Sequence, residues 1–188
     1  VKASESALEQ ALKIVKEGVE LGEIGKAIET EIKSAGFNPV QNLTGHGLEQ
    51  YLQHGPPAIP NIGKKNERKL EDGMAFAIEP FATNGEGFVR EGVQSEIFQI
   101  DEPKPVRNAQ ARKILEFIMT EYKTLPFAER WIAKELKMSD FQRKIALREL
   151  LQKKCISSFP VLKEAEGKLV SQTETSVLLY EGKITVLI

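Results

Sequence analysis

The sequence predicts an α+β protein. Apolar residues recur at helical spacing over residues 4–19 and again from Gly22 to Gly36. Short apolar runs between turn residues follow, and the run MAFAIEPF at 74–81 is typical of a buried strand. Helical spacing returns in residues 105–154. Helices and strands are therefore grouped in blocks, as in α+β proteins.

The first two helices have recognisable ends. Ser4 or Ser6 is suited to cap the first helix, because a serine hydroxyl accepts a hydrogen bond from the exposed backbone N–H groups there. Gly36 is suited to end the second helix, since glycine adopts the left-handed conformation that a helix C-terminus requires.

The segment after the helices is expected to be strand and loop. Three prolines in HGPPAIPNIG predict an irregular surface loop, because proline lacks the N–H that strand pairing uses. The turn EDG at 71–73 precedes the apolar run at 74–81. The segment GFVREGVQSEIFQI at 87–100 predicts a further strand, broken near Gly92.

Residues 105–154 predict three helices. The first carries Ile114, Leu115, Ile118 and Tyr122, and the second carries Phe127, Trp131 and Leu136. Ser139 and Gln142 form a capping box that opens the third, with Ile145 and Leu150 facing inward. A strand near FPVL, a turn at EAEGK, the strand KLVSQTETSVLLY and a final strand in EGKITVLI follow. Three helices followed by a hairpin resemble a winged helix.

Composition narrows the class of protein. A hydrophobic content of 41% with 28% charged residues is typical of a globular protein, and no apolar run is long enough to span a bilayer. No signal-peptide pattern opens the chain, and the single cysteine, Cys155, excludes an intramolecular disulfide. These features predict a cytoplasmic protein. The start at Val1 and the apolar end at Ile188 lead us to expect a part of a longer protein.

Charge is distributed unevenly along the chain. Residues 104–165 contain 14 basic and 7 acidic residues, a net charge of +7, whereas the remainder contains 12 and 20, a net charge of −8. Such asymmetry often marks a boundary between structural units. We therefore expect a basic insertion at 104–165 within a domain formed by residues 1–103 and 166–188.

Four residues stand out as candidates for chemistry. The only histidines, His46 and His54, lie together in NLTGHGLEQYLQHG, and imidazole is a common metal ligand. Glu79 and Glu174 each lie at the edge of an apolar strand, where a buried carboxylate needs a partner such as a metal ion. Each residue considered alone also fits a solvent-exposed loop or strand position.

Several segments together resemble a known family. GHGLEQYLQHGPPAIPN, FAIEPFATNGEG and SQTETSVLLY, in this order, resemble the C-terminal part of a type II methionine aminopeptidase of the archaeal kind. AQAR, TLPFAERW and FPVLKE resemble it as well, so the resemblance covers essentially the whole chain. It implies the pita-bread fold, in which helices cover a curved antiparallel sheet, together with a winged-helix-like insertion.

The resemblance also implies roles for the four residues. His46, Glu79 and Glu174 would bind a pair of divalent metal ions (Co, Mn, Fe or Zn), with Glu174 bridging both ions. Glu79 would also act as the catalytic proton shuttle, and His54 would act in catalysis by contacting the scissile amide of the substrate. The activity implied is a hydrolase that removes the initiator methionine from nascent proteins.

The chain departs from the family pattern in two ways. The family has two aspartate ligands before the histidine, but Asp72, Asp101 and Asp140 all follow His46. A missing N-terminal half, in a second chain or a further segment, would have to supply them, so we expect the isolated chain to be inactive. Thr175 also replaces the histidine that usually follows the bridging glutamate.

A second hypothesis assigns the chain no catalysis. The net charge of +7 over residues 104–165 would suit a pita-bread protein that binds RNA or the ribosome. The joint presence of His46, Glu79 and Glu174 favours the enzyme.

Overall fold

The computed structural model describes residues 1–187 and divides them into two compact units. Unit 1 comprises residues 1–90 and the described residues from 163 onward, and unit 2 comprises residues 91–162. The sequence places the basic insertion at 104–165 instead, and this domain division remains a prediction. Within the described residues, helix length and apolar content rule out a membrane-spanning helix.

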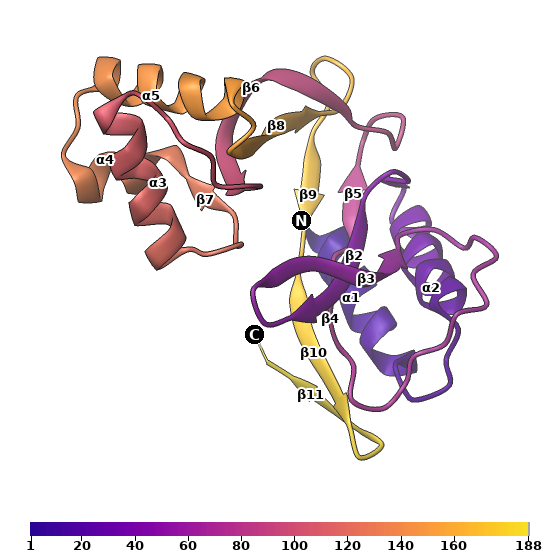
Figure 1. The fold of residues 1–188 in the computed structure, drawn as a ribbon. Coiled ribbons are helices and arrows are strands. Elements are labelled where there is room, and N and C mark those ends of the chain that lie inside the picture. Colours follow the sequence, from indigo (N-terminus) through magenta and orange to yellow (C-terminus); the bar gives the residue numbers. More distant parts are fainter. Residues whose placement is uncertain (188) are drawn as a thin grey trace. The chain divides into compact units, whose positions relative to one another are not determined.

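Unit 1 begins with two helices that lie side by side (Figure 1). They are α1 (Lys2–Ile14) and α2 (Leu21–Ser34). Helix α1 ends earlier than expected, and Val1 is its N-cap residue, with no side-chain hydrogen bond at the cap. The prediction that Ser4 or Ser6 caps α1 is therefore wrong, because both serines lie inside the helix. Gly36 follows α2 at a φ of +80°, as expected for the residue after a C-cap.

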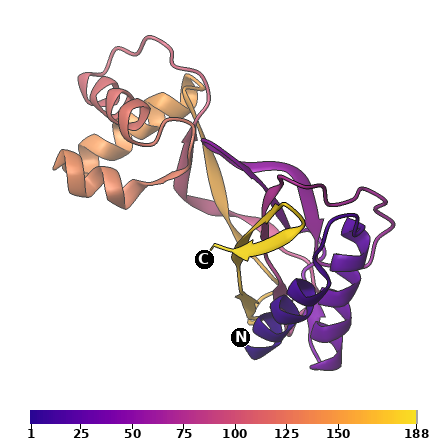
Figure 2. The same ribbon diagram turned by 90° about the horizontal axis from the view of Figure 1, so that it is seen from below.

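A five-stranded antiparallel sheet forms the centre of unit 1. Its strand order is β11-β10-β4-β2-β3. The strands are β2 (Thr44–Glu49), β3 (Leu52–Pro60), β4 (Ala75–Ile78), β10 (Thr175–Tyr180) and β11 (Lys183–Val186). Buried apolar side chains of α1 and α2 pack with side chains from this sheet in one cluster, which includes Ile28, Phe76 and Leu179. Figure 2 shows the two helices of this layer side by side from below.

A second sheet continues the first around a bend. It consists of β1 (Asn38–Pro39), β5 (Phe81–Thr83) and β9 (Val170–Gln172), in the order β1-β5-β9. Strand β4 is followed by β5 after only two residues, and β9 is followed by β10 after two residues. Ile78 pairs with Thr175 before the break and Phe81 pairs with Gln172 after it, so both breaks lie at the same level.

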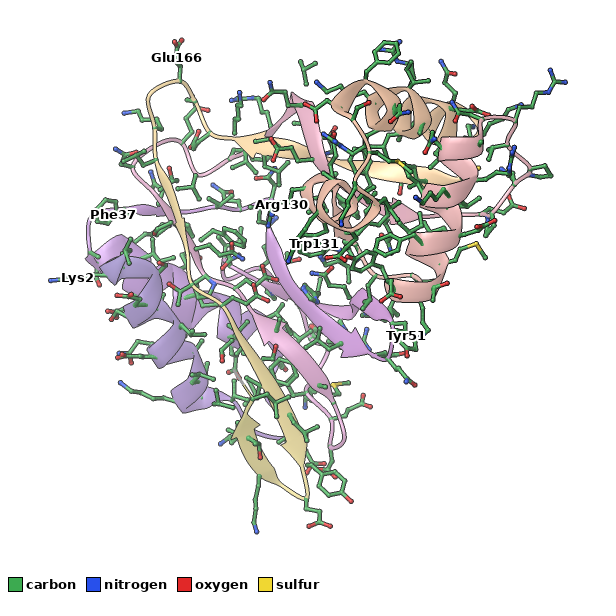
Figure 3. The ribbon with its side chains drawn as sticks, turned by 90° about the vertical axis from the view of Figure 1, so that its left-hand side faces the viewer. Lys2, Phe37, Tyr51, Arg130, Trp131 and Glu166 are labelled. Carbon is green, nitrogen blue, oxygen red and sulfur yellow. The ribbon has the colours of Figure 1, made fainter. Side chains whose placement is uncertain are left out.

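The proline-rich segment is a strand and not the expected loop. Strand β3 pairs with β2 from Leu52 to Pro60, with register shifts near its middle. The prolines are tolerated because β3 is an edge strand, where a missing N–H need not interrupt a ladder. Tyr51 lies at the turn between the two strands (Figure 3).

Unit 2 contains three helices and a three-stranded sheet with its own core. The helices are α3 (Ala109–Glu121), α4 (Glu129–Leu136) and α5 (Asp140–Gln152). The strands are β6 (Arg90–Ile100), β7 (Phe127–Ala128) and β8 (Ile156–Lys163), in the order β7-β6-β8. The core contains the side chains of Phe98, Ile114, Ile118, Phe127, Ala146 and Leu150.

Several expectations for this part of the chain are wrong in detail. Strand β6 runs through Gly92 without the expected break. Ile145 is exposed because Ala146 and Leu147 take the inward positions of α5. Strand β8 lies beside β6 rather than forming a hairpin with the next strand, which is itself divided into β9 and β10. A winged helix therefore remains a prediction, whereas the capping box of Ser139 and Gln142 is confirmed.

Candidate metal centre

Two glutamates lie at the two breaks in the bent sheet of unit 1. Glu79 separates β4 from β5, and Glu174 immediately precedes β10. The two breaks lie opposite each other in the paired strands, so Glu79 and Glu174 are close in space. The Pro80 carbonyl accepts a hydrogen bond from the backbone N–H of Thr173 at 3.2 Å, which ties the two breaks together.

His46 reaches the same point from the middle of β2. It pairs with Ala77 of β4 on one side and with Ala58 of β3 on the other. A Cβ atom at Gly45 would overlap the Ala77 carbonyl oxygen, and a Cβ atom at Gly47 would overlap the Pro56 carbonyl oxygen. The two glycines that flank the histidine are therefore required by the close approach of both neighbouring strands.

The side chains of His46, Glu79 and Glu174 converge. One potential ligand atom from each lies within 4.8 Å of the others, and within the described chain no other group of three or more His, Cys, Asp or Glu side chains does so. His46 and Glu79 are buried, whereas Glu174 is exposed. The group therefore has two buried members and one open to solvent.

The contacts of His46 indicate which of its two ring nitrogens could bind a metal ion. Its Nδ1 lies 3.1 Å from the Gly47 carbonyl oxygen, which can only accept, so Nδ1 carries the proton. Its Nε2 then faces the Glu79 Oε1 atom at 3.2 Å. Two acceptor atoms at this distance need a proton or a cation between them.

The raised pKa of the Glu79 carboxyl also indicates that this position favours a proton or a cation. The pKa of the Glu79 carboxyl is raised from 4.5 to about 7, mainly by burial and also by the charge of Glu174, while a hydrogen bond from Gln172 opposes the shift. A buried carboxylate is stabilised by a nearby cation. One imidazole and two carboxylates, with a proton held where a cation would fit, form a donor set suited to a divalent metal ion.

His54 extends the group along β3. Its ring lies edge-on to that of His46, with centroids 4.7 Å apart. Burial and the neighbouring His46 lower the pKa of His54, while Glu174 acts in the opposite direction. His54 is therefore held in its neutral form near pH 7, in which the ring can both donate and accept a hydrogen bond.

The three aspartates lie elsewhere in the described chain. Asp72 accepts a hydrogen bond from the Gly182 backbone at 3.1 Å, in the turn region of unit 1. Asp101 accepts from the Ser157 hydroxyl at 2.9 Å, and Asp140 pairs with Arg143 at 2.9 Å. None of them belongs to the group formed by His46, Glu79 and Glu174.

Gln172 is a member of the site that the sequence patterns did not single out. Its Nε2 atom donates to Glu79 Oε2 at 2.8 Å and to Glu174 Oε2 at 3.3 Å. One signal was available, because residues two apart on a strand face the same side, and Gln172 lies two residues before Glu174. Thr175, which follows Glu174, is buried in β10 opposite Ile78.

Comparison with known proteins defines the class. Residues 1–101 match metallopeptidase family M24, and the chain belongs to this family. The chain is 46% identical over 186 residues to a methionine aminopeptidase of Archaeoglobus fulgidus, an alignment that covers 99% of this chain and 62% of that protein. The chain thus spans less than two thirds of the length of that curated relative.

Solved structures share the fold. The structure of a thermophilic Arx1 has a TM-score of 0.80 at 16% identity and matches 98% of this chain and 55% of its own. A methionine aminopeptidase from Rickettsia prowazekii has a TM-score of 0.59 at 16% identity, over 99% of this chain and 50% of its own. At such identities the likeness concerns the fold alone, and it confirms the pita-bread arrangement expected from the sequence. Membership of a metallopeptidase family implies a divalent metal cofactor.

Proposed function

We propose that this chain is part of a dinuclear metal-dependent aminopeptidase that removes the initiator methionine from nascent proteins. The observation that carries the proposal is the convergence of His46, Glu79 and Glu174 within 4.8 Å in a chain of family M24. The 46% identity to a methionine aminopeptidase supports the choice of substrate, a peptide with an N-terminal methionine. We place this activity in the cytoplasm, where the ribosome is a further candidate partner.

His46, Glu79 and Glu174 would hold the metal, with Glu174 reaching both ions of a pair. Imidazole with carboxylates suits Co, Mn, Fe or Zn and does not select among them. Bound divalent ions would polarise the scissile carbonyl and make water more acidic. The remaining chemistry belongs to side chains of this chain.

Glu79 is suited to move the proton. A carboxylate beside the reacting atoms can accept a proton and return it in a later step. His54, neutral and exposed beside His46, would donate a hydrogen bond to the scissile amide and orient it. A proton shuttle and an orienting imidazole are thus assigned to neighbouring residues of one site.

The proposal requires ligands from outside these residues. Three ligands do not complete the coordination of two ions, and the aspartates of the described residues serve other contacts. Two further carboxylates would come from another segment or a second polypeptide. Because Glu174 is the exposed member of the group, they would approach from its side. We therefore expect the isolated chain to bind metal weakly and to release almost no methionine.

Methionine release from a Met-Ala-Ser peptide tests the proposal. The chain is assayed alone and after co-expression with the part of the Archaeoglobus fulgidus relative that it does not cover, each with Mn²⁺. We expect release only from the co-expressed sample, and loss of that release in the His46→Ala and Glu79→Gln variants. Full activity of the chain alone would contradict the need for further ligands. A folded complex that releases no methionine would contradict the peptidase function.

The alternative, a non-catalytic RNA- or ribosome-binding protein, depends on other residues. It depends on the net charge of +7 over residues 104–165 and not on His46, Glu79 or Glu174. Salt-dependent RNA binding that survives alanine substitution of all three, together with a silent complex in the peptide assay, would favour it over the enzyme.

A further inference from the structure

The amide of Gln172 lies between the two glutamates of the site. Both protons of its Nε2 atom are used, one toward Glu79 Oε2 at 2.8 Å and the other toward Glu174 Oε2 at 3.3 Å. Since carboxylate oxygens only accept, the orientation of the amide is defined: its nitrogen and not its oxygen faces the pair. The two carboxylates would otherwise repel each other in a partly buried position.

The hydrogen bond from Gln172 also defines the rotation of the Glu79 carboxylate. With Oε2 engaged by the amide, the other oxygen, Oε1, is directed at His46 Nε2, 3.2 Å away. Oε1 and Nε2 are atoms that a metal ion would bind. Gln172 therefore acts on the geometry of Glu79 through the carboxylate oxygen that does not face His46.

A cluster of hydroxyl groups holds Gln172 in this position. Thr173 donates to the Ser4 hydroxyl at 2.8 Å, Ser171 lies 3.1 Å from the same hydroxyl, and Ser4 donates to the Val1 carbonyl at 2.8 Å. Ser4 is fully buried on α1. Alternate residues of the segment 171–174 therefore point to opposite sides: Ser171 and Thr173 toward α1, Gln172 and Glu174 toward the site.

We propose that Gln172 is a positioning residue that holds the Glu79 and Glu174 carboxylates together in a metal-ready arrangement. The proposal rests on the metal site of the proposed function, but it concerns metal affinity and not peptide hydrolysis. Hydrogen-bond partners of metal ligands commonly change metal affinity by 10- to 100-fold when they are removed.

Mn²⁺ titration of the full chain, with free Mn²⁺ measured by electron paramagnetic resonance, tests the proposal. We expect Gln172→Leu to weaken Mn²⁺ binding by about 10- to 100-fold. Gln172→Asn, whose amide is one methylene too short to reach both carboxylates, should show an intermediate loss. The control is Gln99→Leu. Gln99 is, like Gln172, a strand glutamine whose side-chain amide donates a hydrogen bond, but its acceptor is the Thr124 carbonyl at 2.6 Å and it lies in unit 2.

The outcomes separate a positioning role from a structural one. Equal Mn²⁺ affinity in wild type and Gln172→Leu would overturn the proposal, as would an equal loss in Gln99→Leu. The melting temperatures of the metal-free proteins are compared in parallel, so that a misfolded variant is recognised. Gln172→Asn, the smaller change, then carries the test.

Crystal structures of the metal-free wild type and Gln172→Leu provide a second measurement if the wild type holds no Mn²⁺. We expect the carboxylates of Glu79 and Glu174 to separate in the variant and Glu79 Oε1 to turn away from His46. An unchanged arrangement would overturn the proposal. A wild type that binds Mn²⁺ without releasing methionine when complemented would count against the proposed function alone.

Discussion

At the scale of single residues, the contact between His46 and Glu79 determines what the site can hold. With Nδ1 hydrogen-bonded to the Gly47 carbonyl, Nε2 faces a carboxylate oxygen at 3.2 Å. In the absence of metal a proton between these two atoms satisfies both, which agrees with the raised pKa, about 7, of the Glu79 carboxyl group. A metal ion would replace that proton, so protonation and metal binding compete for one position.

The shifted pKa of Glu79 predicts how the stability of the metal-free chain depends on pH. The folded state has a pKa of about 7 and the unfolded state one of 4.5. Between these values the folded state binds more protons, so the free energy of unfolding falls as pH rises from 4.5 to 7 and is constant above. The loss from this group is about 3 kcal/mol.

Urea unfolding in EDTA at pH 5, 6, 7 and 8 measures this dependence. Glu79→Gln should lack this component of the pH dependence and should be more stable than wild type at pH 8. Glu17→Gln, at an exposed glutamate outside the site, is the control. Parallel pH curves for wild type and Glu79→Gln would show that Glu79 is not protonated in the fold.

Competition with a proton also predicts the pH dependence of Mn²⁺ binding. Below pH 7 the ion must displace the Glu79 proton, so affinity should rise about tenfold per pH unit up to pH 7 and level off above. Titrations at pH 6.0, 7.0 and 8.0 measure it. An affinity that is the same at pH 6.0 and 7.0 would mean that Mn²⁺ binds elsewhere.

At the scale of elements, strand β2 is held so tightly between its neighbours that it accepts no side chain beside His46. A methyl group at Gly47 would overlap backbone atoms of Pro56 in β3, and backbone atoms cannot move aside as a flexible side chain can. We expect Gly47→Ala to destabilise the chain by about 2 kcal/mol or more and to weaken Mn²⁺ binding.

Chemical denaturation and Mn²⁺ titration measure the two effects of Gly47→Ala. Gly55→Ala is the matched control, because the nearest atoms to a Cβ there are 3.3 Å away. It should cost clearly less stability than Gly47→Ala. Equal losses in the two variants would indicate that the approach of β3 to β2 is not what requires glycine at position 47.

The capping box of α5 makes an element-scale prediction in unit 2. The Ser139 hydroxyl accepts a hydrogen bond from the Gln142 backbone N–H, and the Gln142 side-chain oxygen accepts one from the Ser139 backbone N–H. We expect Ser139→Ala to lower the free energy of unfolding by about 1 kcal/mol. Ser34→Ala, at an exposed hydroxyl inside α2, is the control. No loss in Ser139→Ala would mean that the cap is replaced by solvent.

Elements with a local signal were predictable from the sequence. The capping box of Ser139 needs only residues three apart, and the end of α2 needs only Gly36, so both were identified correctly. Sequence patterns do not predict strand β3, because prolines are compatible with an edge strand and edge position is a property of the whole sheet. Periodicity places Ile145 inward, whereas the structure exposes it, because periodicity alone does not define which apolar side of α5 meets its neighbours.

The candidate site was predictable only in part for the same reason. His46, Glu79 and Glu174 were singled out by residue type, by neighbouring patterns and by family resemblance, and the fold brings them together. The only sequence signal for Gln172 is its place two residues before Glu174, which does not distinguish it from other polar strand residues. Its importance appears only when the breaks after β4 and before β10 are aligned, since that pairing places its amide between two glutamates.

At the scale of the whole molecule, the two units have separate cores and different chain connectivity. Unit 1 is assembled from residues 1–90 and the described residues from 163 onward, and it contains His46, Glu79 and Glu174, the candidate metal site. Unit 2 is one continuous segment, residues 91–162, with its own apolar cluster. A ligand that binds one unit stabilises that unit by mass action and has no direct effect on the other.

Because the two units have separate cores, we expect a bound metal ion to raise the unfolding temperature of unit 1 without changing that of unit 2. Adding Zn²⁺, a diamagnetic ion that leaves nearby NMR signals visible, at 100 times its dissociation constant should stabilise unit 1 by about 2.7 kcal/mol and leave unit 2 unchanged. Fluorescence of Trp131, the only tryptophan, reports on unit 2, while one-dimensional NMR signals of His46 and His54 report on unit 1. In thermal melts the histidine transition should move upward with Zn²⁺ and the tryptophan transition should stay in place. His46→Ala should abolish the shift, and a shift of both transitions together would show that the two cores unfold as one.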